Sequence, residues 1–271
     1  MHNVNWPTKV LRKLFGTLNQ PIESWHNKTV WLVGASSGIG AALARQLLTL
    51  DAKVVLSARR AEQLRHIAND HPNALIKAFD ASDKALWSEM HSQVLQELGQ
   101  IDLVIFCAAK YQPERTWEVD SLDAQETLNI NLLSIYHGLQ CILPDMLKRR
   151  QGGIALIASV AGYLGLPNAS VYGPSKAALI NLAEIMYADL HPKDLDVYLI
   201  NPGFVSTPLT AKNTFFMPAL QTPEQAAQAI LLGMQGGKFE IHFPKRFTYF
   251  LKLLQCLPYR LRFLLLRRLA S

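Results

Sequence analysis

The chain has 271 residues, of which 49% are hydrophobic and 18% are charged. This length allows one α/β domain or two small ones, and the composition excludes a disordered or fibrous protein. No apolar run reaches the roughly 18–20 residues of a spanning helix and the three cysteines form no CxxC pair, so we expect a protein of a reducing, cytoplasmic compartment that neither spans a membrane nor holds a structural metal.

Apolar, β-branched runs alternate with helical patterns along the chain. The first run, residues 29–34, ends at a glycine and is followed by a helical pattern over residues 39–50. The further strands are predicted at 52–58, 74–79, 101–109, 152–159, 195–200 and 238–243, and the further helices at 61–69, 84–98, 122–147, 172–190 and 223–234. Strands that are apolar on both faces and separated by helices predict a parallel sheet covered on both sides. We therefore expect a doubly wound, Rossmann-type α/β domain of about seven strands over residues 27–243, with helical extensions over residues 1–26 and 244–271.

The turn between the first predicted strand and its helix contains three glycines in the spacing GxxxGxG. Glycines let the backbone turn sharply and approach a pyrophosphate, and the free N–H groups at a helix start favour its negative charge. A tight turn without a ligand is the alternative, because the spacing differs from the commonest dinucleotide fingerprint, GxGxxG. The residues expected to contact a cofactor here are Gly34, Ser36, Ser37, Gly38, Ile39 and Gly40.

The end of the second predicted strand indicates which nucleotide binds. A carboxylate at this place would bind the adenosine ribose of NAD, but the chain has Ala58 followed by Arg59 and Arg60. Two arginines suit the 2′-phosphate of NADP(H) through charge-assisted hydrogen bonds, so we expect NADP(H) rather than NAD(H). The alternative is an exposed arginine pair at the start of a helix.

Tyr172 and Lys176, in the stretch YGPSK, lie one helical turn apart if a helix begins near Pro174. The fixed φ of proline suits the first turn of such a helix. A phenol with a reference pKa of about 10 exchanges protons near neutral pH when a cation stabilises its anion. The alternative is that Tyr172 packs and Lys176 faces water.

Taken in order and spacing, these motifs resemble the short-chain dehydrogenase/reductase family over about residues 29–205. Ser159 precedes Tyr172 by 13 positions, as in the family, and Asn201-Pro202-Gly203 follows the sixth predicted strand. The resemblance implies that Tyr172 is the general acid/base for a carbonyl/alcohol pair. It also implies that Lys176 holds the nicotinamide ribose and lowers the pKa of Tyr172, and that Ser159 stabilises the carbonyl oxygen.

The resemblance assigns roles to further residues. Asn131 would support a water-linked proton relay, with a plain side-chain hydrogen bond as the alternative. Asp80 would lie near the adenine, although an acid serves equally at a helix start. The remaining residues expected against the cofactor are Ala108, Pro202, Gly203, Val205 and Thr207.

One departure from the family lies after the fourth predicted strand. The family usually has Asn-Asn-Ala-Gly there, whereas this chain has Cys107-Ala108-Ala109-Lys110. In the family the asparagines help to brace the sheet and the glycine lets the backbone pass the ribose. The cofactor contacts at this turn are therefore expected to differ.

Both ends of the chain are basic and amphipathic. Residues 7–18 place apolar side chains on one helical face, and the tail from Pro244 has seven lysines and arginines and no acid, with Pro258 dividing it in two. Such helices are too short to span a bilayer but suit the interface of an anionic membrane. The alternatives are that the ends pack on the domain, cover the substrate entrance or form a subunit contact.

The sequence thus predicts an NADP(H)-dependent oxidoreductase acting on the carbonyl/alcohol group of an apolar small molecule. Residues 204–222, which include Phe215 and Phe216, are expected to close over the substrate. We expect a cytoplasmic homo-oligomer without a nucleic-acid partner, and peripheral contact with the inner face of a membrane through the basic ends. A nucleotide sensor or membrane-associated scaffold without turnover is the alternative, against which the intact Ser159, Tyr172 and Lys176 argue.

Overall fold

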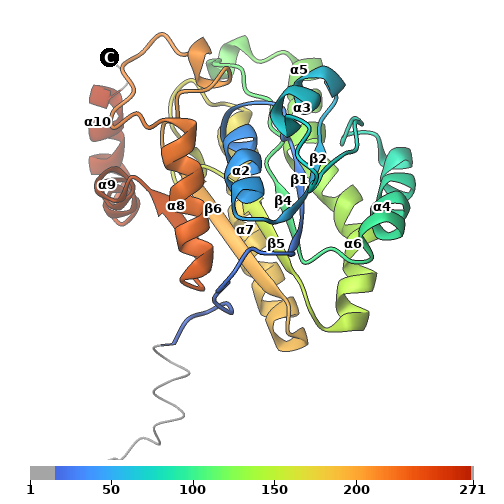
Figure 1. Ribbon diagram of the computed structural model, residues 1–271. Coiled ribbons are helices and arrows are strands. Elements are labelled where there is room, and N and C mark those ends of the chain that lie inside the picture. The colour runs from blue at the N-terminus through green and yellow to red at the C-terminus, as the bar shows by residue number, and fades with distance from the viewer. Residues whose placement is uncertain (1–15, 270–271) are drawn as a thin grey trace, which may run out of the picture.

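A computed structural model describes residues 16–269, and the side chains of residues 16–266, as one parallel sheet with helices on both faces (Figure 1). Its strands are β1 (Thr29–Val33), β2 (Lys53–Ser57), β3 (Ala74–Ile76), β4 (Leu103–Phe106), β5 (Gly153–Ile157), β6 (Asp196–Pro202) and β7 (Glu240–Phe243). The seven strands lie in the order β3-β2-β1-β4-β5-β6-β7, so the direction of winding reverses between β1 and β4. The predicted doubly wound fold is confirmed, and ligands of such sheets bind beyond the carboxyl ends of the strands near that reversal.

Two helical layers cover the sheet. The helices are α2 (Gly38–Thr49), α3 (Ala61–Ala68), α4 (Lys84–Leu98), α5 (Ser121–Leu128), α6 (Ser134–Arg149), α7 (Tyr172–Leu190), α8 (Pro223–Gln235), α9 (Lys245–Gln255) and α10 (Tyr259–Leu269). Side chains of α2, α3 and α8 share one buried cluster with Val30 and Leu32 of β1, whereas those of α4, α6 and α7 share another with Trp31 and Val33. Successive residues of β1 therefore enter opposite cores, which is why the strand is apolar throughout.

An aromatic cluster stabilises the α4 side of the sheet. Trp31 and Trp87 are fully buried with ring centroids 5.5 Å apart. Phe79 meets Trp87 edge-to-face at 5.1 Å. Each such pair contributes about 0.5–1.5 kcal/mol beyond its burial. The cluster therefore fixes the segment after β3, which leads to Asp80.

The structure differs most from the predicted elements in the helix over residues 122–147 and in the strands over residues 74–79 and 101–109. The helix expected over residues 122–147 is interrupted by a π-helical turn, Asn129–Leu133, which joins α5 to α6. The strand expected over residues 74–79 ends at Ile76, although the Lys77 and Phe79 amides still donate to the Leu56 and Ala58 carbonyls beside it. The strand expected over residues 101–109 ends at Phe106, because the amides of Cys107 and Ala108 both donate to the Val33 carbonyl and the chain bends away.

The segment before β1 packs on the domain. The Asn19 side chain is buried and pairs with the backbone of Val197, donating to its carbonyl at 2.7 Å and accepting from its N–H at 3.2 Å. Trp25 is buried in the core that contains α2 and α8. The basic amphipathic helix predicted over residues 7–18 lies largely outside the described residues. Among residues 16–269, no helix combines the length and apolarity that crossing a membrane requires.

The tail forms two helices separated at Pro258, as its sequence predicts, and they lie along one edge of the molecule (Figure 1). Leu251 and Leu254 of α9 and Leu266 of α10 share a buried cluster with Val160 and Leu164. Val160 begins the short 3-10 turn Val160–Gly162 directly after Ser159. One side of the tail is therefore packed against the segment that follows β5.

Candidate functional site

A cavity of about 280 Å³ lies where the carboxyl ends of the strands meet the α2 turn. It is lined by most of the sequence-predicted site residues, namely Gly34, Ser36, Ser37, Gly38, Ile39, Arg59, Arg60, Asp80, Ala108, Ser159, Tyr172, Lys176, Pro202, Gly203, Val205 and Thr207. Gly40 and Asn131 are not in the lining. Within residues 16–266, no three His, Cys, Asp or Glu side chains gather in a way that could hold a metal ion.

The backbone of the glycine turn passes so close to other backbone atoms that two of its glycines leave no room for a side chain. Gly34 has φ +98°, and a Cβ added there would lie 2.3 Å from the backbone nitrogen of Ala108. A Cβ on Gly40 would lie 2.2 Å from the Gly34 carbonyl oxygen, so Gly40 closes the turn from within although it does not line the cavity. Gly38 has φ +55° at the first residue of α2. The turn is therefore compact, and the start of α2 faces the cavity with its free N–H groups, a setting that attracts an anion.

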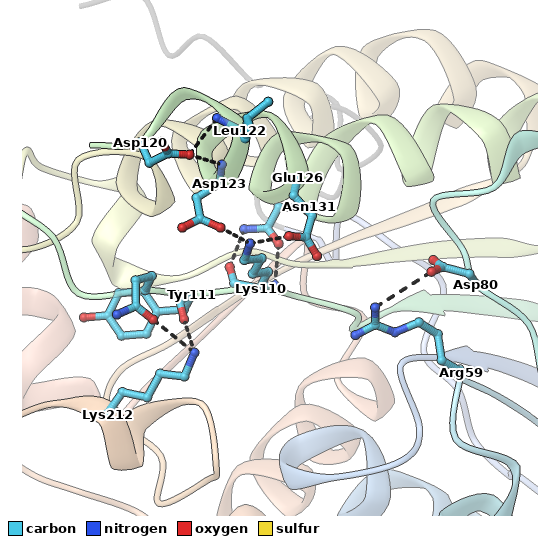
Figure 2. Close-up of polar contacts among 11 residues, drawn as sticks. Arg59, Asp80, Lys110, Tyr111, Asp120, Leu122, Asp123, Glu126, Asn131 and Lys212 are labelled. Atoms are coloured by element: carbon cyan, nitrogen blue, oxygen red, sulfur yellow. Dashed lines mark hydrogen bonds and ion pairs between the residues drawn. The ribbon is translucent and has the colours of Figure 1, made fainter. Parts of the chain in front are cut away.

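Two arginines follow β2 at the rim of the cavity. Arg60 donates from Nη2 to the Ser36 hydroxyl of the glycine turn at 3.0 Å. Arg59 lies 3.8 Å from the Asp80 carboxylate, and both side chains are partly exposed (Figure 2). Asp80 accepts from Ser82 rather than capping α4, whose cap is Asp83. The rim thus joins both arginines, Asp80 and the glycine turn in one charged patch.

Ser159, Tyr172 and Lys176 converge on the opposite wall. Ser159 follows β5, accepts from the Ala161 N–H at 3.1 Å and lines the cavity together with Tyr172. Lys176, one turn into α7 and 2% exposed, donates to the Ile157 carbonyl at 2.8 Å. Its Nζ lies 5.5 Å from the centroid of the Tyr172 ring. The alternative that Lys176 faces water is therefore wrong.

Burial governs the protonation of this wall. It raises the pKa of Tyr172 well above its ordinary value, and the nearby Ser159 hydroxyl offsets only part of this effect. The expectation of a lowered Tyr172 pKa is thus wrong, because the cost of removing the phenolate from water is the largest effect on this group. Burial also lowers the pKa of Lys176 to about 8 and raises the pKa of Cys107 to about 11. Near neutral pH, Tyr172 and Cys107 are therefore protonated and Lys176 is largely charged.

The turn that departs from the family pattern is held by Asn131. The Asn131 amide accepts from the Lys110 N–H at 2.7 Å and donates to the Lys110 carbonyl at 2.9 Å and to the Ser175 hydroxyl at 3.0 Å. The Lys110 side chain turns toward α5, where its Nζ lies 3.0 Å from Asp123 and 2.5 Å from Glu126 (Figure 2). A lysine is accommodated at the glycine position because its side chain leaves the site. These bonds match the plain hydrogen-bonding alternative for Asn131, and a part in a proton relay stays a prediction.

Tyr111, which motif analysis missed, contacts Tyr172 directly. The two ring centroids are 4.8 Å apart, and the Tyr111 hydroxyl donates to Asn213 Oδ1 at 2.8 Å. Lys212 Nζ donates to the Tyr111 carbonyl at 2.9 Å. Tyr111 therefore links the proposed proton donor to the segment expected to close over the substrate. Its place just beyond β4, where doubly wound sheets hold their ligands, is the signal that could have identified it.

Comparisons with known proteins agree with this architecture. A family model described as short chain dehydrogenase matches residues 28–215. An uncharacterized oxidoreductase of Staphylococcus epidermidis is 31% identical over 189 residues, or 69% of this chain and 82% of that protein. Dehydrogenase/reductase SDR family member 7 of Mus musculus is 32% identical over 169 residues, or 59% of this chain and 50% of that protein. A short chain dehydrogenase/reductase structure from Burkholderia phymatum matches with a TM-score of 0.77 at 22% identity, covering 85% of this chain and 93% of that one. The chain belongs to the short-chain dehydrogenase family of oxidoreductases, as its motifs predicted.

Proposed function

We propose that the protein is an NADP(H)-dependent oxidoreductase that transfers a hydride between nicotinamide and the carbonyl/alcohol group of an apolar substrate. The observation that carries the proposal is the convergence of Ser159, Tyr172 and Lys176 on one wall of a cavity whose other wall is the glycine turn. A nucleotide sensor would need only the glycine turn. The enzyme is the better account, because a buried lysine beside a buried phenol is costly without a chemical role.

The residues of the cavity fit a dinucleotide. The glycine turn and the start of α2 would receive the pyrophosphate, since their N–H groups are free and no Cβ fills the approach. Arg60 would bind a 2′-phosphate, because it already donates to Ser36 and has no carboxylate partner among residues 16–266. Arg59 is partly neutralised by Asp80 and is expected to contribute less. The Burkholderia phymatum structure contains NAD, which does not by itself favour NADP(H). The preference for NADP(H) proposed here rests on Arg59 and Arg60 alone.

The proton chemistry is assigned to Tyr172. In the reductive direction its protonated hydroxyl gives a proton to the substrate oxygen, and in the oxidative direction it takes one from the alcohol. Ser159 would donate to the same oxygen as negative charge develops on it. Lys176 holds its charge beside the phenol and would bind the ribose, while Asn131 fixes the backbone at Lys110 and, through Ser175, the start of α7. Nicotinamide supplies or accepts the hydride.

An apolar substrate is favoured by the segment after β6. Phe204 packs against Phe215 with ring centroids 5.9 Å apart and against Phe247 of α9 at 5.7 Å. Pro208 and Leu209 line the cavity next to Thr207. These side chains offer little hydrogen bonding, so an apolar molecule with one carbonyl or hydroxyl group fits best. The proposal includes a cytoplasmic homo-oligomer that meets the inner face of a membrane.

A panel of ketones and aldehydes tests the proposal. NADPH oxidation would be followed with wild-type protein and the variant Tyr172→Phe, and NADPH binding would be measured separately. We expect turnover by wild-type protein, a loss of at least about a hundredfold in the variant and retained binding. Binding without turnover of any substrate would favour the nucleotide sensor, and equal turnover by both proteins would remove Tyr172 as the proton donor.

A further inference from the structure

The tail helices have an outer face that the domain does not cover. Their inner side chains, Leu251, Leu254 and Leu266, are buried against Val160 and Leu164. An amphipathic helix that has already buried one apolar face is normally polar on the other. The outer faces of α9 and α10 are instead largely apolar and aromatic.

The exposure of these side chains is large. On α9, Tyr249 is 59% exposed, Phe250 44% and Leu253 64%, and on α10, Phe263 is 53% and Leu264 52% exposed. Positions 249, 250 and 253 have the spacing of one helical face. Scattered single leucines on a surface are ordinary, whereas a gathered set on adjoining helices indicates an interaction surface.

Positive charge accompanies this face. Lys245, Arg246 and Arg260 are exposed on the same two helices, and from Pro244 to Ser271 the sequence contains no Asp or Glu. We propose that the outer face of α9 and α10 docks on the surface of an anionic lipid bilayer. Each helix has 11 residues, which suits a helix lying in the interface and not one that spans.

The charge decides between a bilayer and a second copy of the chain. Pairing two such faces would bring two sets of lysines and arginines together without any acid on either side, which costs free energy through like-charge repulsion. An anionic bilayer supplies the opposite charge to the basic side chains and a hydrocarbon boundary to the aromatic and leucine side chains. Of these two occupants, only the bilayer matches both the charge and the apolar side chains of the face.

The tail is tied to the substrate side of the domain. Lys252 of α9 hydrogen-bonds Glu240, which also accepts from Tyr163 at 2.5 Å and from Asn201 at 2.9 Å. Tyr163 follows the turn after Ser159, and Asn201 immediately precedes Pro202 of the cavity lining. A bilayer on the outer face would thus lie at a fixed distance from the cavity. This arrangement would let the protein take its substrate from the membrane, a step that rests on the apolar substrate of the proposed function.

Vesicle sedimentation with the full chain tests the docking surface. The proteins compared are the wild type, Phe250→Ser/Leu253→Ser, and Leu122→Ser/Leu232→Ser as a matched control, whose residues are 74% and 59% exposed elsewhere on the domain. We expect wild type and control to bind mixed phosphatidylcholine–phosphatidylglycerol vesicles. The tail variant should bind about tenfold more weakly or worse, since two large apolar side chains no longer enter the interface. Binding should fall for pure phosphatidylcholine and on adding salt.

Two results would overturn the inference. One is equal binding of the tail variant and the wild type to the mixed vesicles, with thermal unfolding showing that both are folded. The other is a change of oligomeric state in the tail variant with no vesicle binding by the wild type, which would assign the face to a second copy. Because vesicle binding is measured without substrate or NADPH, its outcome is independent of whether Tyr172 supports turnover.

Discussion

Tyr111 meets Tyr172 edge-on, with the two rings inclined by 63°. Burial raises the pKa of Tyr111 to about 12, so its hydroxyl stays protonated and serves as a donor to Asn213. The proposed proton donor is thus packed against a residue that also holds the segment between β6 and α8. The closure over the substrate that we expect of this segment would therefore act on the position of Tyr172.

Two substitutions of Tyr111 should distinguish the effect of its ring contact with Tyr172 from that of its hydrogen bond to Asn213. Tyr111→Phe keeps the ring against Tyr172 and loses the bond to Asn213, so we expect KM for the carbonyl substrate to rise about threefold to tenfold with little change in kcat. Tyr111→Ala also loses the ring contact, and kcat should fall by about tenfold. Steady-state NADPH oxidation measures both values. Identical kinetics of the two variants would show that the ring contact does not position Tyr172.

Arg60 should determine the preference for NADPH. Arg60→Ala removes a charge-assisted donor to the 2′-phosphate, so KM for NADPH should rise about tenfold to a hundredfold while KM for NADH changes little. Arg59→Ala should have a smaller effect, because Asp80 already engages that arginine. Arg65→Ala, on the exposed side of α3, is the control. An equal loss for both nucleotides in Arg60→Ala would exclude a phosphate-specific role.

Asn131 should contribute to stability through the backbone of Lys110. Asn131→Ala leaves the half-buried Lys110 N–H and carbonyl without their side-chain partner, so the free energy of unfolding should fall by about 1–3 kcal/mol. Lys110→Ala removes only the exposed ion pairs with Asp123 and Glu126 and should cost less than about 1 kcal/mol. Urea unfolding measures both. Equal losses would place the stabilisation in the side chain of Lys110 instead of its backbone.

His242 should make the protein less stable in acid. It is buried, with Nδ1 2.6 Å from the Thr248 hydroxyl, and burial and then Lys245 lower its pKa from 6.5 to about 4. Because the unfolded chain binds a proton at higher pH than the folded one, the stability from neutral His242 is present above pH 6.5 and is lost as the pH falls toward 4.

Thermal unfolding over this pH range tests the effect of His242. The variant His242→Gln should show a smaller fall in Tm between neutral pH and pH 4, and His66→Gln, whose residue is exposed on α3, should behave as the wild type. The same pH dependence in all three proteins would assign the acid sensitivity to other groups, among them Glu240, whose carboxylate holds Lys252.

The sheet could be predicted from sequence because its signal is local. Runs such as residues 29–33 are apolar on both faces, and only a strand covered on both sides requires that. The π-helical turn could not be predicted, since it accompanies bonds from Asn131 to Lys110 and Ser175, which lie 21 and 44 positions away. The helical pattern of residues 122–147 is local and therefore does not indicate that Asn131 bonds to Lys110 and Ser175.

The site residues that belong to sequence motifs could be predicted, and those outside the motifs could not. The spacing of Ser159, Tyr172 and Lys176 identified side chains that do meet, because each sits at a fixed place after β5 or in the first turns of α7. Tyr111 belongs to no motif, and its role comes from the distance to Tyr172 alone. The direction of the Tyr172 pKa shift was missed because burial is a property of the folded chain.

The aromatic cluster of Trp31, Phe79 and Trp87 gives the cavity an optical reporter. Phe79 touches both Trp31 and Trp87 and also lines the cavity at the end that Asp80 borders. Reduced nicotinamide absorbs light in the range where indole emits, so a bound NADPH would accept excitation energy from these two buried tryptophans. The fold thus contains a built-in donor for titrating nucleotide by fluorescence, without a label and before any substrate is known.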